Sequence, residues 1–282
     1  MKELDPQNVT EVVLDQLSST PNSRLREIVD SLVKHIHSFV REVNLTPEEL
    51  SEGLGFLTDV GHTCNDKRQE FILLSEVLGI ETLVYTLADR LGEEHGTPTS
   101  ILGPFYLPHV PTLELGASIV GERRPGLAFY GKVMDASRRP IRNASVEIWQ
   151  TDEEGLYDVQ RPEFDDSDLR GRFYTNDAGM YYLKSILPLG YSIPMDGPVG
   201  RLVKAQHRHG MRPAHVHFII SASGFKSLTT AVYLKGDPYL ESDTVFGVTE
   251  SLVGVVAGED PSSPILGLPA LRFDVQLRTA DQ

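Results

Sequence analysis

The first third of the chain repeats apolar residues at the spacing of an α-helix. Between residues 9 and 91 they recur every three or four positions. The clearest stripe is Leu25, Ile28, Val29, Leu32, Val33, Ile36 and Val40. Such spacing puts apolar side chains on one face of a helix. We therefore predict helices across this region, with further helices over Asp66 to Leu78 and Ile80 to Leu91, separated by Gly79.

One helix start is marked by four consecutive residues. Thr46 can cap the helix, Pro47 suits its first position, and Glu49 can return the capping hydrogen bond. The sequence therefore predicts that a helix begins at Pro47.

The pattern changes after Gly92, where the helical period ends. Glycine and proline interrupt the chain at Gly96, Pro98, Gly103, Pro104, Pro108 and Pro111. Short β-type runs follow at residues 127–134, 145–149, 179–183, 215–221 and 228–234, separated by turn residues. Such spacing is typical of an antiparallel β-sandwich. We predict an α+β protein with a helical domain at residues 1–95 and a β-sandwich domain at residues 96–282.

Composition and charge exclude several classes of function. The 282 residues carry a formal net charge of −14, and no stripe of Lys and Arg reverses it locally, so nucleic acid is not an expected partner. Cys64 is the single cysteine, which excludes an intrachain disulfide and a cysteine-based zinc site. No apolar run has the length of a signal peptide or a membrane span, so a cytoplasmic protein is expected.

The sharpest chemical signal is a pair of histidines at the start of a β run. His215 and His217 are two residues apart, and such residues point to the same face of a strand. Both imidazoles can therefore address one metal ion, while Ala214 and Val216 face the sandwich core. His35 and His37 share the spacing but lie in a helical stripe, where the two side chains diverge.

Other ligands for such a metal are less obvious from the residues. His207 and His209 form a third pair, in a polar loop with no strand to orient it. Asp, Glu or Tyr could complete the site, and Tyr157 and Tyr191 are expected in loops beside strands. Each tyrosine taken alone is more often a packing residue.

A set of motifs narrows these alternatives. They are Val146-Glu147-Ile148-Trp149-Gln150, Gly155-Leu156-Tyr157, Arg170-Gly171-Arg172-Phe173-Tyr174-Thr175, the ten residues from Tyr191 to Gly200, and Arg212-Pro213-Ala214-His215-Val216-His217. In this order and spacing they resemble the intradiol ring-cleaving dioxygenases. The Tyr191-Ser192-Ile193-Pro194 and Asp243-Thr244-Val245-Phe246-Gly247-Val248 segments are most similar to the hydroxyquinol-cleaving members, with catechol and chlorocatechol dioxygenases as near relatives.

The resemblance implies one Fe(III) per subunit, held by Tyr157, Tyr191, His215 and His217. Coordination to such a hard cation lowers the pKa of a phenol, so both tyrosines can bind as phenolates. It further implies that Tyr191 is the ligand that leaves and accepts a substrate proton. Arg212 is expected beside the ring, where its fixed charge stabilises a developing anion.

The resemblance also implies the substrate pocket and the assembly. Its expected walls are Leu73, Glu76, Gly103, Pro104, Phe105, Ile193, Pro194 and Val245. Glu76 can accept a hydrogen bond from a third hydroxyl on the substrate, or it can be a solvated helix residue. Ala231 stands where catechol-cleaving members usually carry glutamine, which weakens the assignment to catechol. Relatives pair through their N-terminal helices, so a homodimer with a bound phospholipid is expected.

The expected reaction is therefore insertion of O2 into an aromatic vicinal diol, with hydroxyquinol as the substrate and catechol or chlorocatechol as the alternative. Two other classes stay open. Parts of the sandwich resemble transthyretin-like binding modules, which lack the four ligands. A zinc hydrolase could use His215 and His217, although zinc sites usually add carboxylate, histidine or cysteine rather than two tyrosines.

Overall fold

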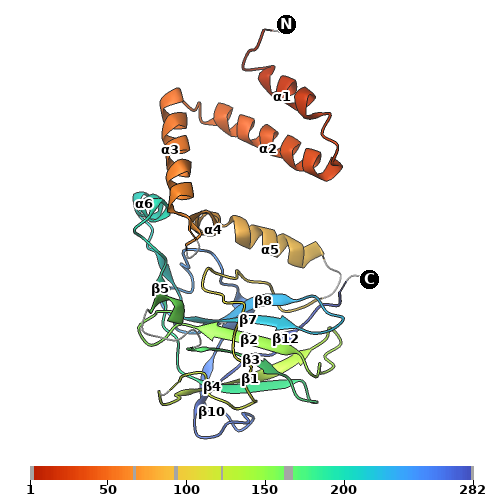
Figure 1. Ribbon diagram of the computed structural model, residues 1–282, viewed down its shortest axis with the longest axis vertical. Coiled ribbons are helices and arrows are strands. Elements are labelled where there is room, and N and C mark those ends of the chain that lie inside the picture. Colours follow the sequence, from red (N-terminus) through yellow and green to blue (C-terminus); the bar gives the residue numbers. More distant parts are fainter. Residues whose placement is uncertain (1–2, 66–67, 92–94, 122, 162–167, 281–282) are drawn as a thin grey trace. The chain divides into compact units, whose positions relative to one another are not determined.

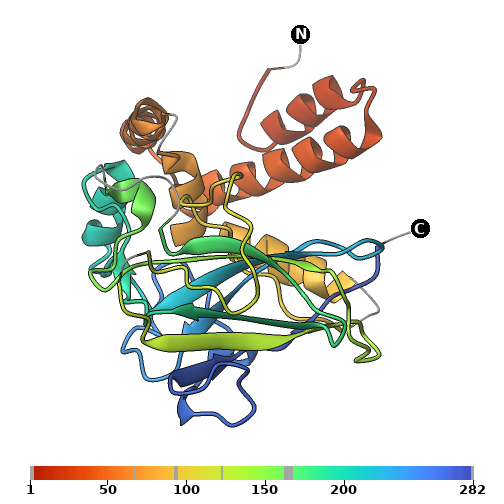
Figure 2. The same cartoon turned by 60° about the horizontal axis from the view of Figure 1, so that its bottom comes forward.

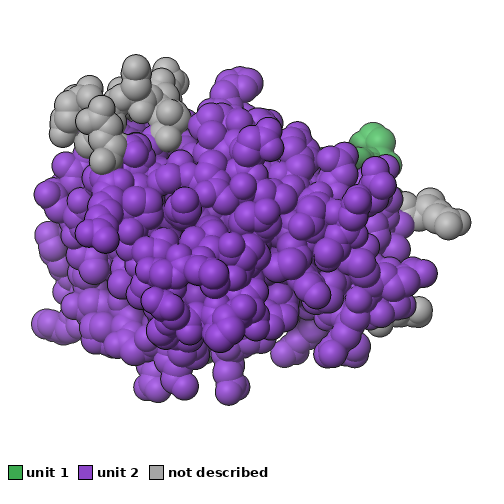
Figure 3. Space-filling model, turned by 90° about the horizontal axis from the view of Figure 1, so that it is seen from below, with its two compact units in different colours: residues 1–59 green, residues 60–282 purple. Residues whose placement is uncertain are grey.

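The computed structural model describes residues 3–65, 68–91, 95–121, 123–161 and 168–280. The chain forms two compact units, residues 1–59 and 60–282, which Figure 3 distinguishes by colour. The predicted boundary between residues 95 and 96 follows the change from a helical to a β-type sequence pattern and is a different division from these two units. The assignment of residues 1–95 as a dimerisation domain stays a prediction.

The first unit consists of helices that begin at polar caps. Helix α1 spans Val9–Leu17, α2 spans Ser23–Glu42, and α3 begins at Pro47 and ends at Thr63 in the second unit. The predicted capping box of α3 is confirmed. The backbone N–H of Glu49 donates to Thr46 Oγ1 at 3.2 Å, and the N–H of Thr46 donates to Glu49 Oε2 at 2.9 Å.

Two further helices belong to the same unit as the sandwich. Helix α4 spans Glu70–Val77, and α5 spans Ile80–Leu91; the bounds of α5 are those predicted. Gly79 between them adopts a left-handed φ of 69°, which glycine allows without strain. The helix predicted from Asp66 begins only at Glu70, and residues 66 and 67 lie outside the described part.

Within the described residues, no single helix is both long and apolar enough to cross a membrane. Helices α4 and α5 reach the required length and apolar composition only when they are counted together, and the chain bends by 68° between them.

The remaining chain folds into two packed sheets (Figures 1 and 2). The first has the order β10-β11-β1-β12 with β4 also paired to β1, and the second has the order β3-β2-β7-β8-β9. The first sheet comprises β1 Leu127–Met134, β4 Met180–Ser185, β10 Val256–Glu259, β11 Pro269–Arg272 and β12 Val275–Gln276. The second comprises β2 Ser145–Gln150, β3 Arg170–Tyr174, β7 His215–Ser221, β8 Leu228–Leu234 and β9 Val253–Gly254.

The sheets are mixed rather than purely antiparallel. Strand β1 pairs in parallel with β11 and β12, and β8 pairs in parallel with β9. These parallel partners are short strands from the C-terminal third of the chain: β9 and β12 lie at sheet edges, and β11 lies between β10 and β1. The helical region followed by a β-sandwich confirms the predicted α+β class.

The core lies between the two sheets. Phe129 and Leu183 come from the first sheet, and Val146, Val216 and Phe218 come from the second. All five are fully buried. Because inward and outward side chains alternate along a strand, this packing fixes which residues of β7 face away from the core.

Short elements lie in the connections between the longer strands. They are the 3₁₀ helix η1 Asp158–Gln160, the strand β5 Tyr191–Ser192, the helix α6 Pro198–Ala205, the strand β6 Met211–Arg212 and the 3₁₀ helix η2 Glu250–Leu252. Strands β5 and β6 pair with each other as a small antiparallel ribbon.

Candidate active site

Strand β7 presents two histidines on one face, as predicted. Ala214, Val216 and Phe218 belong to the hydrophobic core, whereas His215 and His217 face away from it and are 1% exposed. Their Nε2 atoms are 3.0 Å apart. Two imidazoles are thus directed to one point.

The Nδ1–H of His215 donates to the carbonyl of Pro213 at 2.6 Å, because a carbonyl can only accept. The Nε2 of His215 therefore carries a free lone pair. Burial and the charge of Arg212 lower the pKa of both imidazoles well below the usual value, so both rings are neutral, the form that binds a metal.

Tyr157 reaches the same point from the loop before η1. Gly155 makes the preceding turn with a φ of 78°, and the backbone N–H of Tyr157 donates to Gln160 Oε1 at 2.9 Å. The Tyr157 hydroxyl lies 3.4 Å from His215 Nε2, and the side chain is fully buried.

Tyr191 lies in strand β5, not in a loop as the sequence predicted. It pairs directly with Arg212 of β6, and this ribbon directs its ring toward Tyr157. The two rings are 5.4 Å apart and almost perpendicular, at 88°. The loop prediction was wrong because a two-residue strand carries no alternation that a sequence pattern can reveal.

The buried phenols need a cation in order to ionise. Burial raises the pKa of Tyr157 well above its usual value, and Tyr191 raises it further. Burial also raises the pKa of Tyr191, while the nearby charge of Arg212 opposes the rise. Both phenols therefore stay protonated unless a positive ion binds between them.

The nitrogen and oxygen donor atoms suit a metal ion that prefers such ligands. A metal with ligand bonds of about 2.0–2.2 Å keeps neighbouring donor atoms roughly 3–3.5 Å apart. The 3.0 Å between the two imidazole nitrogens and the 3.4 Å from His215 to the Tyr157 hydroxyl fall in this range. Among the described residues no group of three His, Cys, Asp or Glu could hold a metal. The tyrosines are therefore the available additional donors.

Arg212 lies beside these donors and is 2% exposed. Its Nη1–H donates to the Tyr191 hydroxyl at 3.2 Å and lies 3.3 Å from His215 Nε2. The other side of the guanidinium donates from Nε to Asp243 and from Nη2 to the Tyr233 hydroxyl, each at 3.3 Å. The fixed charge is thus held at the edge of the candidate metal ligands.

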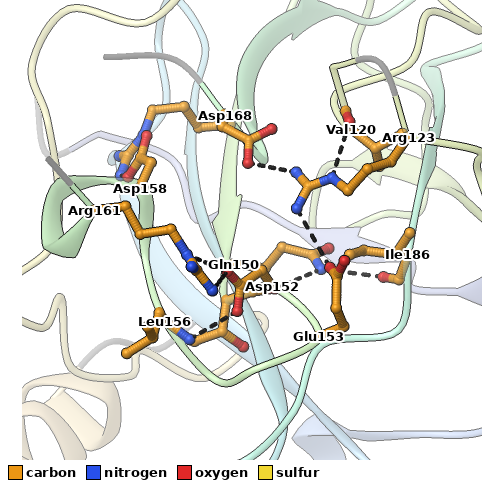
Figure 4. A network of polar contacts seen from close by, with 12 residues as sticks. Val120, Arg123, Gln150, Asp152, Glu153, Leu156, Asp158, Arg161, Asp168 and Ile186 are labelled. Atoms are coloured by element: carbon orange, nitrogen blue, oxygen red, sulfur yellow. Dashed lines mark hydrogen bonds and ion pairs between the residues drawn. The ribbon is translucent and has the colours of Figure 1, made fainter. Parts of the chain in front are cut away.

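A polar network shapes the loop that carries Tyr157 (Figure 4). Arg170 of β3 forms a fully buried ion pair with Asp158, the residue after Tyr157, and also donates to the carbonyl of Phe105 at 3.2 Å. On the outer side, Arg161 pairs with Asp152, whose carboxylate accepts the backbone N–H of Leu156 at 3.0 Å. These contacts fix the backbone on both sides of Tyr157.

A pocket opens between α4 and the loops near this cluster. It is lined by five of the residues predicted for the substrate site, Leu73, Glu76, Pro104, Phe105 and Pro194, together with Arg68, Gln69, Glu70 and Ile72. Phe105 also stacks on Tyr157 with ring centres 4.5 Å apart. The pocket therefore adjoins the candidate metal ligands.

The other three predicted wall residues lie elsewhere around the site. Gly103 lies against His217, where an added Cβ would be 3.5 Å from Cε1. Ile193 follows β5 and is 4% exposed, and Val245 is fully buried. These three do not line the pocket itself, and their contact with a substrate stays a prediction.

Glu76 is a buried residue, so the solvated alternative is wrong. It is 3% exposed, and its Oε1 has no hydrogen-bond partner among the described residues. Burial raises its pKa to about 7; the charge of Arg212 lowers it, while Glu81 and Asp243 raise it further. A bound ligand can supply the hydrogen bond that this buried oxygen lacks.

Several residues around the site were not assigned from the sequence. Trp149 stacks on His217, with ring centres 4.9 Å apart and planes 5° from parallel. Tyr233 and Asp243 hold Arg212, and Arg170 pairs with Asp158. Only strand register could have identified Trp149 and Tyr233, because they lie directly opposite His217 and His215 in the neighbouring strands.

Comparisons with known proteins agree with this geometry. A family described as "Dioxygenase" matches residues 101–279, and one described as "Catechol dioxygenase N terminus" matches residues 22–96. The chain is 43% identical to the 6-chlorohydroxyquinol 1,2-dioxygenase of Cupriavidus pinatubonensis, over 90% of this chain and 92% of that protein. It is 40% identical to the hydroxyquinol 1,2-dioxygenase of Corynebacterium glutamicum, over 92% of this chain and 86% of that protein.

A solved structure is similar over almost the whole length. The hydroxyquinol 1,2-dioxygenase from Pseudomonas putida DLL-E4 superposes with a TM-score of 0.91 at 35% identity, covering 98% of this chain and 99% of that one. Intradiol dioxygenases use non-haem iron. The chain therefore belongs to the intradiol ring-cleavage dioxygenase family.

Proposed function

We propose that this enzyme cleaves hydroxyquinol with O2 between its two adjacent hydroxylated carbons, giving 3-hydroxy-cis,cis-muconate, the tautomer of maleylacetate. Both oxygen atoms enter the product, so the reaction needs no other reductant or oxidant. The observation that carries the choice of substrate is Glu76, which lines the pocket with a buried carboxyl group whose Oε1 has no hydrogen-bond partner among the described residues. The names of the similar relatives support the same choice.

We propose one Fe(III) per subunit, bound by Tyr157, Tyr191, His215 and His217. The support is the chemistry of the donors: two neutral imidazoles and two phenols that cannot ionise without a cation. Two phenolates reduce the net charge of the bound ion and favour the ferric over the ferrous state. When bound, the iron supplies an attachment point for both diol oxygens and withdraws electron density from the ring.

The protein's own groups then handle protons and charge. The oxygen of Tyr191 is the proposed acceptor of one diol proton, since it is buried and already receives a hydrogen bond from Arg212. Arg212 keeps its charge throughout. Burial by itself lowers its pKa, but Asp243 and the neighbouring tyrosines raise the pKa well above the usual value. This fixed charge stabilises negative charge that develops on the ring.

The proposed pocket positions the ring and excludes water. Leu73, Pro104, Phe105 and Pro194 offer apolar contacts, and Glu76 receives the third hydroxyl. Gly103, Ile193 and Val245 are proposed to complete the walls. Ala231 lies directly opposite His217 on the neighbouring strand, so a glutamine there would have reached toward the histidine pair.

Oxygen uptake with a panel of diols tests this function. Iron-loaded enzyme is given hydroxyquinol, catechol and 4-chlorocatechol, and kcat/KM is measured for each. We expect the largest value for hydroxyquinol. A larger value for catechol would assign the enzyme to the catechol-cleaving group, and no uptake with any diol would contradict the proposed function.

We also propose a homodimer formed through the N-terminal helices, with a phospholipid held among them. The support is an apolar stripe on α2 whose members are each about half exposed: Leu25, Ile28, Leu32, Ile36 and Phe39. Burying such a stripe in a partner surface is favourable. A monomer by light scattering at micromolar concentration would contradict the dimer, and an organic extract without lipid would contradict the phospholipid.

A further inference from the structure

The segment His207-Arg208-His209 holds an arginine that bridges two walls of the active site. The Arg208 Nη1–H donates to the carbonyl of Val77 at 2.9 Å. The Nη2–H donates to the carbonyl of Thr244 at 2.7 Å. Val77 is the last residue of α4, directly after Glu76, and Thr244 directly precedes Val245. One guanidinium thus joins the helix that carries Glu76 to the loop at residues 243–247.

Phe246 strengthens this bridge. The Arg208 guanidinium carbon lies 5.0 Å from the centre of the Phe246 ring, close enough for a cation–π interaction. Phe246 has a left-handed φ of 59°, an unfavourable conformation for a bulky residue that the surrounding contacts must maintain. Its ring packs on the turn between α4 and α5, where a Cβ added to Gly79 would be 3.4 Å away.

Three more hydrogen bonds hold the same loop. The Thr82 hydroxyl of α5 donates to the carbonyl of Val245 at 3.2 Å. At the base of the loop, Asp243 accepts the backbone N–H of Gly247 at 3.0 Å and the Nε–H of Arg212 at 3.3 Å. A shift of the loop would therefore move both Val245 and the carboxylate that holds Arg212.

The histidines beside Arg208 do not take part in this bridge. His209 accepts the backbone N–H of Met211 through Nδ1 at 3.1 Å, and its Nε2 lies 3.0 Å from the Ser242 hydroxyl. His207 is exposed and adopts a left-handed φ of 56° at the end of α6. The bridging group of this segment is the arginine.

We propose that Arg208 is a positioning residue that sets substrate preference, because it fixes the C-terminal end of α4, and with it Glu76, relative to the loop at residues 243–247. This inference rests on the proposed function, in which Glu76 receives the third hydroxyl of hydroxyquinol. Arg208 acts through the two walls and does not itself contact the substrate. Lysine cannot replace it fully, since one ammonium lacks the planar fork that reaches two carbonyls.

The test compares Arg208→Gln and Arg208→Lys with wild type and with Arg139→Gln. Arg139 is an exposed arginine that pairs with Asp135 in a turn outside the site, so it controls for loss of an arginine. For Arg208→Gln we expect kcat/KM for hydroxyquinol to fall about tenfold, mainly through KM, and kcat/KM for catechol to change less than about twofold. Arg208→Lys should lie between wild type and Arg208→Gln, with iron content unchanged in both variants.

The ratio of the two kcat/KM values separates positioning from a merely structural role. An unchanged ratio in Arg208→Gln would overturn the inference. This holds both when activity is retained and when activity toward the two substrates falls equally together with the iron content. A fall of the ratio in Arg139→Gln as large as in Arg208→Gln would overturn it too. The proposed function fails separately, if wild type cleaves no diol or prefers catechol before any residue is changed.

Discussion

Replacing Glu76 tests how the enzyme distinguishes hydroxyquinol from catechol. Glu76→Gln keeps the shape of the side chain and removes its charge, whereas Glu76→Leu removes the polar group. In wild type the carboxyl group is 3% exposed and its Oε1 has no hydrogen-bond partner among the described residues. Hydroxyquinol can supply a donor through its third hydroxyl, and catechol cannot.

The expected magnitude follows from that single hydrogen bond. A hydrogen bond to a charged acceptor contributes roughly 1.5–3 kcal/mol, which corresponds to about a ten- to hundredfold preference in kcat/KM. Glu76→Leu should lose this preference. Glu76→Gln should retain part of it, because a neutral amide oxygen accepts a weaker hydrogen bond.

The preference should also depend on pH, because burial raises the pKa of Glu76 from 4.5 to about 7. The charge of Arg212 opposes this rise, and Glu81 and Asp243 add to it. The carboxyl group is protonated below about pH 7 and ionised above it. Since the ionised form is the stronger acceptor, the ratio of kcat/KM for hydroxyquinol to that for catechol should increase from pH 6 to pH 8 in wild type.

Stability should change in the opposite direction. A carboxyl group with a raised pKa binds its proton more tightly in the folded than in the unfolded state. Its contribution to the free energy of unfolding is therefore lost as pH rises from 4.5 to about 7. Glu76→Gln avoids this loss, so above pH 7 it should be more stable than wild type, by at most about 3 kcal/mol.

The assay measures kcat/KM for both substrates between pH 6 and pH 8, beside thermal unfolding over the same range. Glu259→Gln, a change of an exposed carboxylate in β10, is the matched control and should behave as wild type. The reasoning is refuted if the wild-type ratio is independent of pH, or if Glu76→Leu keeps the wild-type ratio.

Three further predictions concern the residues around the proposed iron site. Tyr157→Phe, His215→Ala and His217→Ala should each remove iron, measured by metal analysis, because each deletes a ligand; full iron content in any of them would contradict its assignment. Tyr191→Phe should keep part of the iron, shift the visible absorption band and slow turnover strongly, whereas full activity would end its assigned role. Arg170→Met should lower the free energy of unfolding by about 3–5 kcal/mol in denaturant titration, because Asp158 is left as a buried charge without its partner; a loss below about 1 kcal/mol would contradict this.

Periodicity in the sequence predicted the long elements well. Helix α5 and the strands β1, β7 and β8 have the predicted bounds. In each of them the apolar residues form a continuous run or recur at a regular spacing, which sequence analysis detects. Helix α6 was not predicted. It has only eight residues, and its start depends on a distant residue, since Glu70 Oε1 accepts the backbone N–H of Val199 at 3.1 Å.

The proposed metal ligands could be inferred from the sequence for two different reasons. The alternation of β7 alone put His215 and His217 on one face. Tyr157 and Tyr191 lie 34 residues apart in short elements, and only the family resemblance joined them to the histidines. The residues that hold Arg212 and the bridge made by Arg208 could not be predicted, because these contacts join segments whose proximity only the fold establishes.

The most direct test of the central claim is the fate of ¹⁸O2 during turnover of hydroxyquinol by the iron-loaded enzyme. We expect a ring-opened dicarboxylate that carries both labelled atoms, one in each of the two carboxyl groups formed at the cleaved bond. Mass spectrometry of the product and its fragments reads this directly. A product cleaved beside the diol rather than between its carbons, or a dicarboxylate without ¹⁸O, would contradict it.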